Sequence, residues 1–308
     1  MTSRPTLLIM QRHLAPLSPL LEATYDVYRL WEGPPVEAQA VVQAVVVAGE
    51  FPLDQALIQQ LPNLRLIACF TSGYDGIDVD WCRARDLEVT HAPGVNHEDV
   101  ADHALGLIIA ARRQIVSGDR LLRDGGWTAD SKIITPSLRG QKLGVVGMGS
   151  IGESLAARAE ALGLQVSWWG PRPKDVRWPY VADLTALARQ SDILVVACRA
   201  DETNRGLLSR EVIEALGPGG LLVNIARGQL VDEDALIAAL RDGRLGQAAL
   251  DVFETEPTDP DRWVDVPNVV VTPHTAGATT EAVQRMLMLL MQNLDAVLSG
   301  RPAVTPAP

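Results

Sequence analysis

Three ionisable residues of different types, Arg227, Glu256 and His274, each follow a short apolar run of the kind that forms a strand. They lie in the segments NIARG (224–228), DVFETEP (251–257) and TPH (272–274). Arginine is a permanent cation, glutamate is a carboxylate, and histidine is a proton donor that titrates near neutrality. Because open α/β sheets bind ligands at the carboxyl ends of their strands, the three side chains could together carry out acid–base chemistry on a ligand.

Taken singly, these residues have structural explanations. Arg227 could cap the turn before a helix at 232–241, and Glu256 could be one solvated acid in ETEPTDPD. Their shared position at strand ends favours a site over coincidence. The remaining histidines are weaker candidates, with packing or an interface expected for His103 and loop positions for His13, His91 and His97. No His, Cys or Asp cluster has metal-binding spacing, so we predict no metal site.

A glycine-rich segment, GMGSIG (147–152), matches the dinucleotide-binding pattern G-x-G-x-x-G. The pattern alone is weak, but here an apolar strand precedes it and an alanine-rich helix follows it. In that setting Gly147 permits the tight turn, Gly149 lets a pyrophosphate approach the backbone, and Gly152 lets helix and strand pack closely. A purely structural glycine turn is the alternative.

The segment WWGPRPK (168–174) ends the second strand of this series without the acid that usually binds an adenine ribose. Gly170 stands near the expected position, and Arg172 and Lys174 follow it. An acid would repel a 2′-phosphate, whereas glycine leaves room and arginine can bind it in a bidentate manner. We therefore expect NADP(H) to be preferred over NAD(H). The alternative is that both cations are solvated loop charges.

Composition limits the partners. Lys and Arg number 27 against 38 Asp and Glu, a net charge of −11, which argues against nucleic acid and anionic membrane surfaces. Three scattered cysteines without a CxxC pair fit a reducing cytoplasm, where we expect the protein to be. The N-terminal apolar run is too short for a signal peptide, and no stretch approaches a membrane span.

Apolar strand patterns alternate with helical ones in two series, before residue 98 and after residue 142, which predicts an α/β fold with parallel sheets. We expect two Rossmann-like or flavodoxin-like lobes with the active site in the cleft between them. The substrate-binding domain would span 1–97 and be completed by a C-terminal helix in 281–308. The dinucleotide-binding domain would span 98–280 and begin with a long helix from Glu98 to about Val116. We expect the tail PAVTPAP to be frayed.

Taken in order, several motifs make the chain resemble the D-isomer-specific 2-hydroxyacid dehydrogenase family. They are FTSGYDGIDVD (70–80), HAPGVNHEDVADHALGL (91–107), KLGVVGMGSIG, NIARGQLVDEDAL, ALDVFETEP and TPHTAGAT (272–279). Within the family, the segment after the second strand is most similar to that of NADPH-dependent glyoxylate/hydroxypyruvate and hydroxyphenylpyruvate reductases.

This resemblance implies a role for each matching residue. Arg227 would bind the substrate carboxylate and keto oxygen, His274 would be the general acid of reduction, and Glu256 would orient His274. Backbone N–H groups in the Thr71–Tyr74 turn, with Ser72, Gly73 and Tyr74 as contacts, would hold the rest of the carboxylate. Asp251 would approach the nicotinamide amide. We expect cofactor contacts at Gly147, Met148, Gly149, Ser150, Ile151, Gly152, Gly170, Arg172, Lys174, Cys198, Ile225, Ala226, Asp251, His274 and Ala276.

The implied activity is reduction of a short 2-keto acid, such as glyoxylate or hydroxypyruvate, to the D-2-hydroxy acid with NADPH. Two alternatives stay open: an NAD-dependent dehydrogenase, and a nucleotide-sensing interaction protein of the same fold. The long helix from Glu98 and the segment GGWTADSKIITPSLRG after it resemble the family's dimer-forming region. We therefore expect a homodimer.

Overall fold

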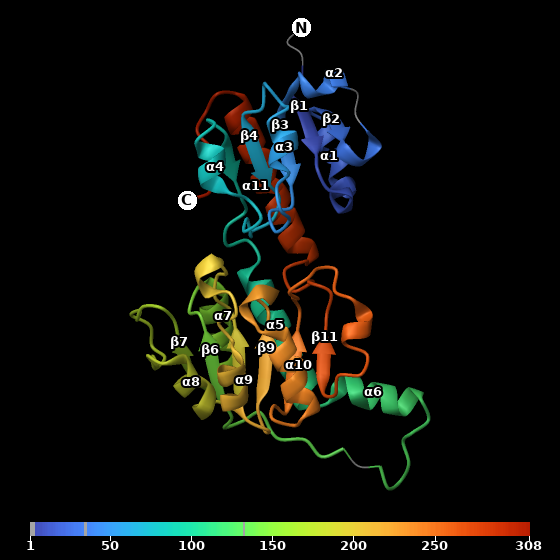
Figure 1. Cartoon of the computed structure of the whole chain (residues 1–308), viewed down its shortest axis with the longest axis vertical. Coiled ribbons are helices and arrows are strands. Elements are labelled where there is room, and N and C mark those ends of the chain that lie inside the picture. Colours follow the sequence, from blue (N-terminus) through green and yellow to red (C-terminus); the bar gives the residue numbers. More distant parts are fainter. Residues whose placement is uncertain (1–3, 34–35, 132) are drawn as a thin grey trace. The chain divides into compact units, whose positions relative to one another are not determined.

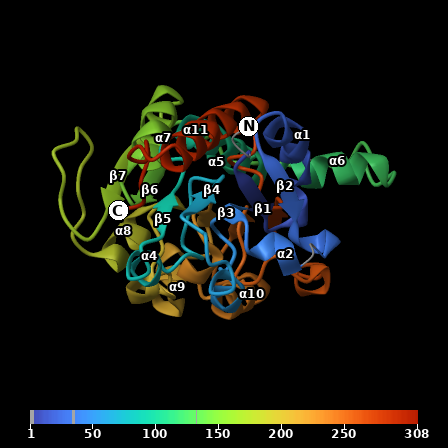
Figure 2. The same ribbon diagram turned by 90° about the horizontal axis from the view of Figure 1, so that it is seen from above.

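A computed structural model describes residues 4–33, 36–131 and 133–308 and divides the chain into two compact units (Figures 1 and 2). Unit 1 comprises the chain up to Val95 together with Thr280–Pro308, and unit 2 comprises Asn96–Thr279. The N-terminal segment of unit 1 thus ends at Val95, whereas we expected it to end at residue 97. Its C-terminal segment begins at Thr280, one residue before the expected start at 281.

Unit 1 is built on a five-stranded parallel sheet in the order β2-β1-β3-β4-β5. Its strands are β1 (Thr6–Ile9), β2 (Asp26–Arg29), β3 (Val42–Val47), β4 (Leu66–Cys69) and β5 (Glu88–Thr90). The helices are α1 (Ser18–Glu22), α2 (Val36–Gln39), α3 (Gln55–Ile58), α4 (Val79–Arg83) and α11 (Thr280–Leu298), with 3₁₀ turns at Arg12–Leu17 and Leu30–Glu32.

The C-terminal helix α11 supplies much of one face of the core of unit 1. Met286, Leu290 and Leu294 recur at intervals of four residues, which places them on one side of the helix. They are buried with Leu66 of β4 and Val46 of β3. The last helix of the chain therefore completes a sheet formed by its first residues.

Unit 2 is built on a six-stranded parallel sheet in the order β11-β10-β9-β8-β6-β7. Its strands are β6 (Lys142–Val146), β7 (Gln165–Trp169), β8 (Ile193–Val196), β9 (Leu221–Asn224), β10 (Gln247–Leu250) and β11 (Val269–Val271). The helices are α5 (His97–Arg112), α6 (Ile115–Arg123), α7 (Ser150–Ala161), α8 (Leu184–Gln190), α9 (Arg210–Leu216) and α10 (Glu233–Arg241), with 3₁₀ turns at Glu202–Asn204, Gly228–Leu230 and Pro260–Arg262.

Both faces of this second sheet are covered, because its central strands are apolar on both sides. Helices α5 and α7 pack on one face, where Ala104, Ala156 and Ala159 allow close approach. Helices α8, α9 and α10 pack on the other face. Because the strands are parallel, the carboxyl ends of β6 and β8–β11 lie along one edge of the sheet.

Three sequence expectations about local structure are wrong. His97, for which we expected a loop position, is the first residue of α5. The single helix expected from Glu98 to Val116 is interrupted between α5 and α6, because Gln114 adopts a left-handed conformation at φ 51°. The C-terminal tail, expected to be frayed, is docked on β5. Ala307 N–H donates to the Val89 carbonyl at 2.8 Å, and Thr90 pairs with Pro306 in an antiparallel bridge.

Candidate active site

The glycine-rich loop after β6 has the geometry that each of its glycines predicts. Gly147 has φ 98°, and a Cβ there would lie 2.5 Å from the Cα of Cys198 on the loop after β8. A Cβ on Gly152 would lie 2.2 Å from the Gly147 carbonyl oxygen. Gly149 instead has open space around its Cβ position and precedes α7 directly. The open, exposed N-terminus of α7 fits a pyrophosphate group.

The predicted phosphate-binding segment follows β7 and folds against the glycine-rich loop. Gly170 is buried, and its carbonyl accepts a hydrogen bond from the Tyr180 hydroxyl at 3.0 Å. Lys174 Nζ donates to the Met148 carbonyl at 2.6 Å, which ties the segment to the loop. Arg172 is exposed. Arg172 and Lys174 are thus two exposed cations on the segment where we expect the adenine ribose.

His274 and Glu256 form a direct pair in unit 2. The distance between His274 Nδ1 and Glu256 Oε2 is 2.6 Å, and Phe253 N–H donates to Glu256 Oε1 at 2.9 Å. Because Nδ1 is engaged by the carboxylate, Nε2 is the nitrogen that can meet a ligand. The His274 backbone is left-handed at φ 51° and its N–H donates to the Asp251 carbonyl at 2.8 Å.

In the His274–Glu256 pair, each group shifts the pKa of the other in the direction that favours the charged form. Burial alone would lower the pKa of His274, but the hydrogen bond and charge of Glu256 outweigh burial and raise that pKa above its ordinary value. Burial would raise the pKa of Glu256, yet the hydrogen bond and charge of His274 lower it on balance. His274 therefore holds its proton to a higher pH than a solvated histidine does.

Arg227 belongs to the same group of side chains. Its positive charge contributes to lowering the pKa of both Glu256 and His274, as a neighbouring cation must. Its Nη1 donates to the Ala226 carbonyl at 2.8 Å. A Cβ on Gly228 would lie 1.8 Å from the Phe253 carbonyl carbon, so only glycine lets the two loops approach. Unit 2 thus brings together Arg227, Glu256 and His274, the three residues predicted to be catalytic.

Asp251 supports the loop that carries His274. It is fully buried, and its carboxylate accepts hydrogen bonds from Thr272 Oγ1 at 2.6 Å and from Thr275 N–H and Ala276 N–H, both at 2.9 Å. Burial would raise its pKa, but these donors and His103 lower it on balance. With both oxygens engaged, the contact of Asp251 with a nicotinamide amide stays a prediction.

Sequence reasoning missed three supporting residues. Asn224 at the end of β9 is buried. Its Oδ1 accepts a hydrogen bond from the Ala226 N–H, and its Nδ2 donates to the Arg227 carbonyl. Thr272 binds Asp251. His103 of α5, for which we expected packing or an interface, lies 3.1 Å from Thr272 Oγ1 and 3.4 Å from Asp251 Oδ1. Polar residues directly at strand ends were the available signal for the first two.

The remaining predicted cofactor contacts fall on the same edge of the sheet. Ile225 and Ala226 follow β9 and are buried, as is Ala276 beyond β11. Met148 is buried, whereas Ser150 is exposed at the start of α7 and Ile151 is partly exposed. Burial raises the pKa of the Cys198 thiol to about 11, so this residue is neutral beside the loop.

The predicted substrate turn, Thr71–Tyr74, follows β4 in unit 1. Thr71 Oγ1 donates to Glu50 Oε2 at 2.9 Å and accepts from Gly49 N–H at 2.9 Å. A Cβ on Gly49 would lie 2.2 Å from the Gly73 carbonyl oxygen. The turn is therefore packed directly against the loop after β3. The expected location of the active site between the two units stays a prediction.

Within the described parts of the chain, no three His, Cys, Asp or Glu side chains are grouped so that they could hold a metal ion. Among the helices that the structure describes, none is both long and apolar enough to cross a bilayer. The three cysteines form no disulfide.

Comparisons with known proteins identify the family of the chain. Residues 105–276 match the family model described as D-isomer specific 2-hydroxyacid dehydrogenase, NAD binding domain. Glyoxylate/hydroxypyruvate reductase A from Arabidopsis thaliana is 40% identical over 292 residues, covering 93% of each chain. Hydroxyphenylpyruvate reductase from Plectranthus scutellarioides is 38% identical and covers 95% of this chain and 97% of its own length.

Solved structures extend the similarity to the whole chain. A 2-hydroxyacid dehydrogenase from Ketogulonicigenium vulgare superimposes with a TM-score of 0.92 at 38% identity and covers 100% of this chain and 99% of that one. The NADPH-dependent glyoxylate/hydroxypyruvate reductase of Sinorhizobium meliloti, in complex with NADP and malonate, superimposes with a TM-score of 0.91 at 34% identity. The match covers 99% of this chain and 97% of that one. The chain therefore belongs to the D-isomer-specific 2-hydroxyacid dehydrogenase family and is an oxidoreductase.

Proposed function

We propose that the protein reduces a short 2-keto acid, such as glyoxylate or hydroxypyruvate, to the D-2-hydroxy acid with NADPH. The observation that carries the proposal is the His274–Glu256 pair with Arg227 beside it, at the same sheet edge as the glycine-rich loop. The names of the relatives from Arabidopsis and Sinorhizobium support the substrate class.

The roles follow from charge. The nicotinamide cofactor, when bound, supplies the hydride that reaches the carbonyl carbon, and negative charge then develops on the keto oxygen. His274 donates the proton from Nε2 to that oxygen, and Arg227 stabilises the same charge and the substrate carboxylate. Glu256 holds the resulting imidazole in orientation until it is reprotonated from solvent. Backbone N–H groups of the Thr71–Tyr74 turn bind the carboxylate.

The preference for NADPH rests on the segment after β7. No acid stands at Gly170, and Lys174 holds the segment against the glycine-rich loop while Arg172 stays exposed. A guanidinium binds a phosphate with two parallel hydrogen bonds, whereas a ribose hydroxyl gains little from it. The Sinorhizobium relative, solved with NADP, supports this preference.

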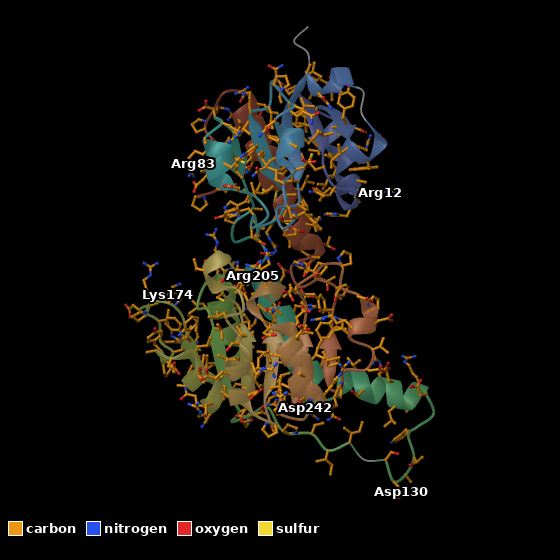
Figure 3. All side chains as sticks on the ribbon, in the orientation of Figure 1. Arg12, Arg83, Asp130, Lys174, Arg205 and Asp242 are labelled. Atoms are coloured by element: carbon orange, nitrogen blue, oxygen red, sulfur yellow. The ribbon has the colours of Figure 1, made fainter. Side chains whose placement is uncertain are left out.

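The first experiment compares initial rates with glyoxylate, hydroxypyruvate and phenylpyruvate, using NADPH and NADH in parallel. We expect faster turnover with NADPH, and we expect Arg172→Ala to raise the KM for NADPH while the KM for NADH stays unchanged. Arg83→Ala, an exposed arginine of unit 1 (Figure 3), is the matched control. Turnover with NADH alone would support an NAD-dependent dehydrogenase, and cofactor binding without turnover would support a nucleotide-sensing protein.

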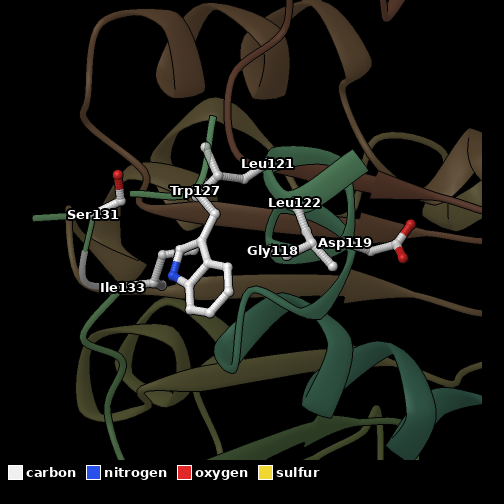
Figure 4. Close-up of a pocket in the computed structure, with 7 residues that line it drawn as sticks. All are labelled: Gly118, Asp119, Leu121, Leu122, Trp127, Ser131 and Ile133. Carbon is white, nitrogen blue, oxygen red and sulfur yellow. The ribbon is translucent and has the colours of Figure 1, made fainter. Parts of the chain in front are cut away.

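We also propose a homodimer formed through an arm of unit 2, residues 115–131 and 133–137. Helix α6 has no buried residue, and it projects from the unit in both views (Figures 1 and 2), with Asp130 near the tip of the segment that follows (Figure 3). Trp127 is 66% exposed and Ile134 is 89% exposed. Trp127, Leu122 and Ile133 line a hollow of about 390 Å³ (Figure 4). Such apolar exposure suits a second copy of the chain.

Light scattering coupled to size exclusion tests the dimer. Wild type should elute at twice the mass of the 33.2 kDa chain, and Trp127→Asp combined with Ile134→Asp should give a monomer. Val264→Asp, on an equally exposed apolar residue outside the arm, should remain dimeric. A monomeric wild type would overturn this part of the proposal.

A cytoplasmic location is proposed on the cysteines alone. Cys69 and Cys82 are buried thiols, and Cys198 is partly buried beside the glycine-rich loop. Three free thiols suit a reducing compartment. Fractionation of the host cells would test the location.

A further inference from the structure

In unit 1, His91 holds the back of the predicted substrate turn. It follows β5, and its Nδ1 lies 2.9 Å from the Ser72 carbonyl oxygen. A carbonyl oxygen only accepts, so Nδ1 carries the proton and donates it. The imidazole also meets the Tyr74 ring edge-on, with ring centroids 4.7 Å apart. Two further hydrogen bonds tie the turn to Ala92, the residue after His91. Ser72 Oγ donates to the Ala92 carbonyl at 2.6 Å, and the Ala92 N–H donates to the Thr71 carbonyl at 3.1 Å.

The His91 bond sets the direction of a backbone donor. The Ser72 carbonyl and the Gly73 N–H belong to one planar trans peptide, so they point in opposite directions. Holding the carbonyl toward His91 therefore aims the Gly73 N–H the other way. Glycine has no Cβ to resist rotation of this peptide, because it populates positive and negative φ almost equally. The hydrogen bond from His91 adds a restraint that acts directly on the Ser72–Gly73 peptide.

His91 is in turn held by the C-terminal tail. Its N–H donates to the Thr305 carbonyl at 3.2 Å, and Thr305 Oγ1 donates to the His91 carbonyl at 2.6 Å. Asn293 of α11, which is 1% exposed, fixes the tail from the other side. Its Nδ2 donates to Thr305 Oγ1 at 2.8 Å, and its Oδ1 accepts from the Val304 and Thr305 N–H groups, both at 3.0 Å.

We propose that His91 is a positioning residue for the substrate carboxylate, and that the C-terminal tail keeps it in place through Thr305 and Asn293. The inference rests on the proposed reduction of a 2-keto acid, in which the Gly73 N–H binds the carboxylate. His91 acts through the Ser72–Gly73 peptide and takes no part in proton transfer. The tail, whose residues lie outside the motifs of the family, thereby contributes to substrate affinity.

The test compares His91→Phe with His91→Asn in the full chain. Phenylalanine keeps a ring beside Tyr74 but has no donor, whereas the asparagine Nδ2 can occupy the place of the histidine Nδ1. We expect His91→Phe to raise the KM for glyoxylate about tenfold, equivalent to about 1.4 kcal/mol, with kcat changed far less. His91→Asn should restore the KM, and the Kd for NADPH should be the same in all three proteins.

A second pair tests the tail. Thr305→Val removes the hydroxyl at nearly constant volume and should raise the KM in the same direction by a smaller factor, whereas Thr305→Ser should behave as wild type. An unchanged KM in both His91→Phe and Thr305→Val, in a wild type that turns over, would overturn the inference and leave the proposed function intact. The inference would also be overturned if His91→Phe lowered both stability and kcat and His91→Asn did not restore them.

Absence of turnover in the wild type would count against the proposed function instead, and a binding probe then decides the inference. Calorimetry with malonate on the NADPH-bound chain should give a Kd that His91→Phe weakens about tenfold and His91→Asn restores. Equal malonate affinity in all three proteins, or no affinity in the wild type, would overturn it.

Discussion

The two parallel sheets present candidate site residues at the same kind of edge but with different groups. Unit 1 offers backbone N–H groups from a turn after β4, held by His91 and Thr71. Unit 2 offers the side chains of Arg227, Glu256 and His274. A fixed carboxylate needs only oriented dipoles, whereas a proton in transfer needs a group whose pKa can be shifted. The proposed recognition groups and the proposed catalytic groups therefore leave different traces in the sequence.

Removing the proton donor should have the largest effect. We expect His274→Ala to lower kcat for keto-acid reduction roughly 10²- to 10⁴-fold, the usual contribution of general acid catalysis. The Kd for NADPH, measured by quenching of tryptophan fluorescence, should change far less than kcat, because His274 is only one of the expected cofactor contacts. Near-normal turnover in this variant would mean that His274 of unit 2 is not the proton donor. The proposed contrast between the two units would then be wrong.

Removing the cation should have the next largest effect. Hydrogen bonds to charged groups contribute about 1.5–3 kcal/mol, so Arg227→Gln should lower kcat/KM by about 10- to 150-fold. Steady-state kinetics with glyoxylate would show both a higher KM and a lower kcat, because Arg227 meets the carboxylate and the developing charge. A change confined to KM would place Arg227 with the recognition groups of unit 1.

The pair should be visible in pH dependence. Reduction needs protonated His274, so kcat/KM should persist through neutrality and fall as pH rises through its raised pKa. Glu256→Gln removes the charge that raises this pKa, so the falling limb should move to lower pH and kcat/KM at pH 7.5 should drop roughly tenfold. An unmoved limb would show that another group sets the profile.

The smallest effects should separate the two units most cleanly. Gly49→Ala and Gly152→Ala each place a Cβ 2.2 Å from a backbone carbonyl oxygen, of Gly73 and Gly147 respectively. Overpacking of this kind costs about 1–3 kcal/mol. We expect Gly49→Ala to raise the KM for the keto acid alone and Gly152→Ala to raise the Kd for NADPH alone. Thermal melts should report the shared loss of stability.

The residues of unit 2 could be predicted from sequence because each lies at the end of an apolar strand and differs in type from its neighbours. The glycine-rich loop was predicted for the same reason, since its flanking elements are clear. The Thr71–Tyr74 turn followed only from the family resemblance, because backbone donors have no residue signature. The supports were not predicted: Thr305 and His91 are 214 positions apart, and no local pattern links them.

Local conformation was the other limit. The break between α5 and α6 occurs at Gln114, a residue that seldom adopts the left-handed region, in a stretch whose apolar periodicity continues through it. The tail was expected to be frayed, as the ends of a chain often are. Its order comes instead from the buried amide of Asn293, whose two polar groups need partners.

The discontinuity of unit 1 has a consequence for synthesis on the ribosome. Unit 2 is one continuous stretch and can fold once residue 279 has emerged. Unit 1 cannot, because Leu290 and Leu294 of α11 complete its core and are made only after the whole of unit 2. Until α11 has emerged, the apolar surface of β3 and β4 that it covers stays exposed. Nascent chains arrested before α11 should therefore be sensitive to protease in residues 4–95 while residues 96–279 already resist it.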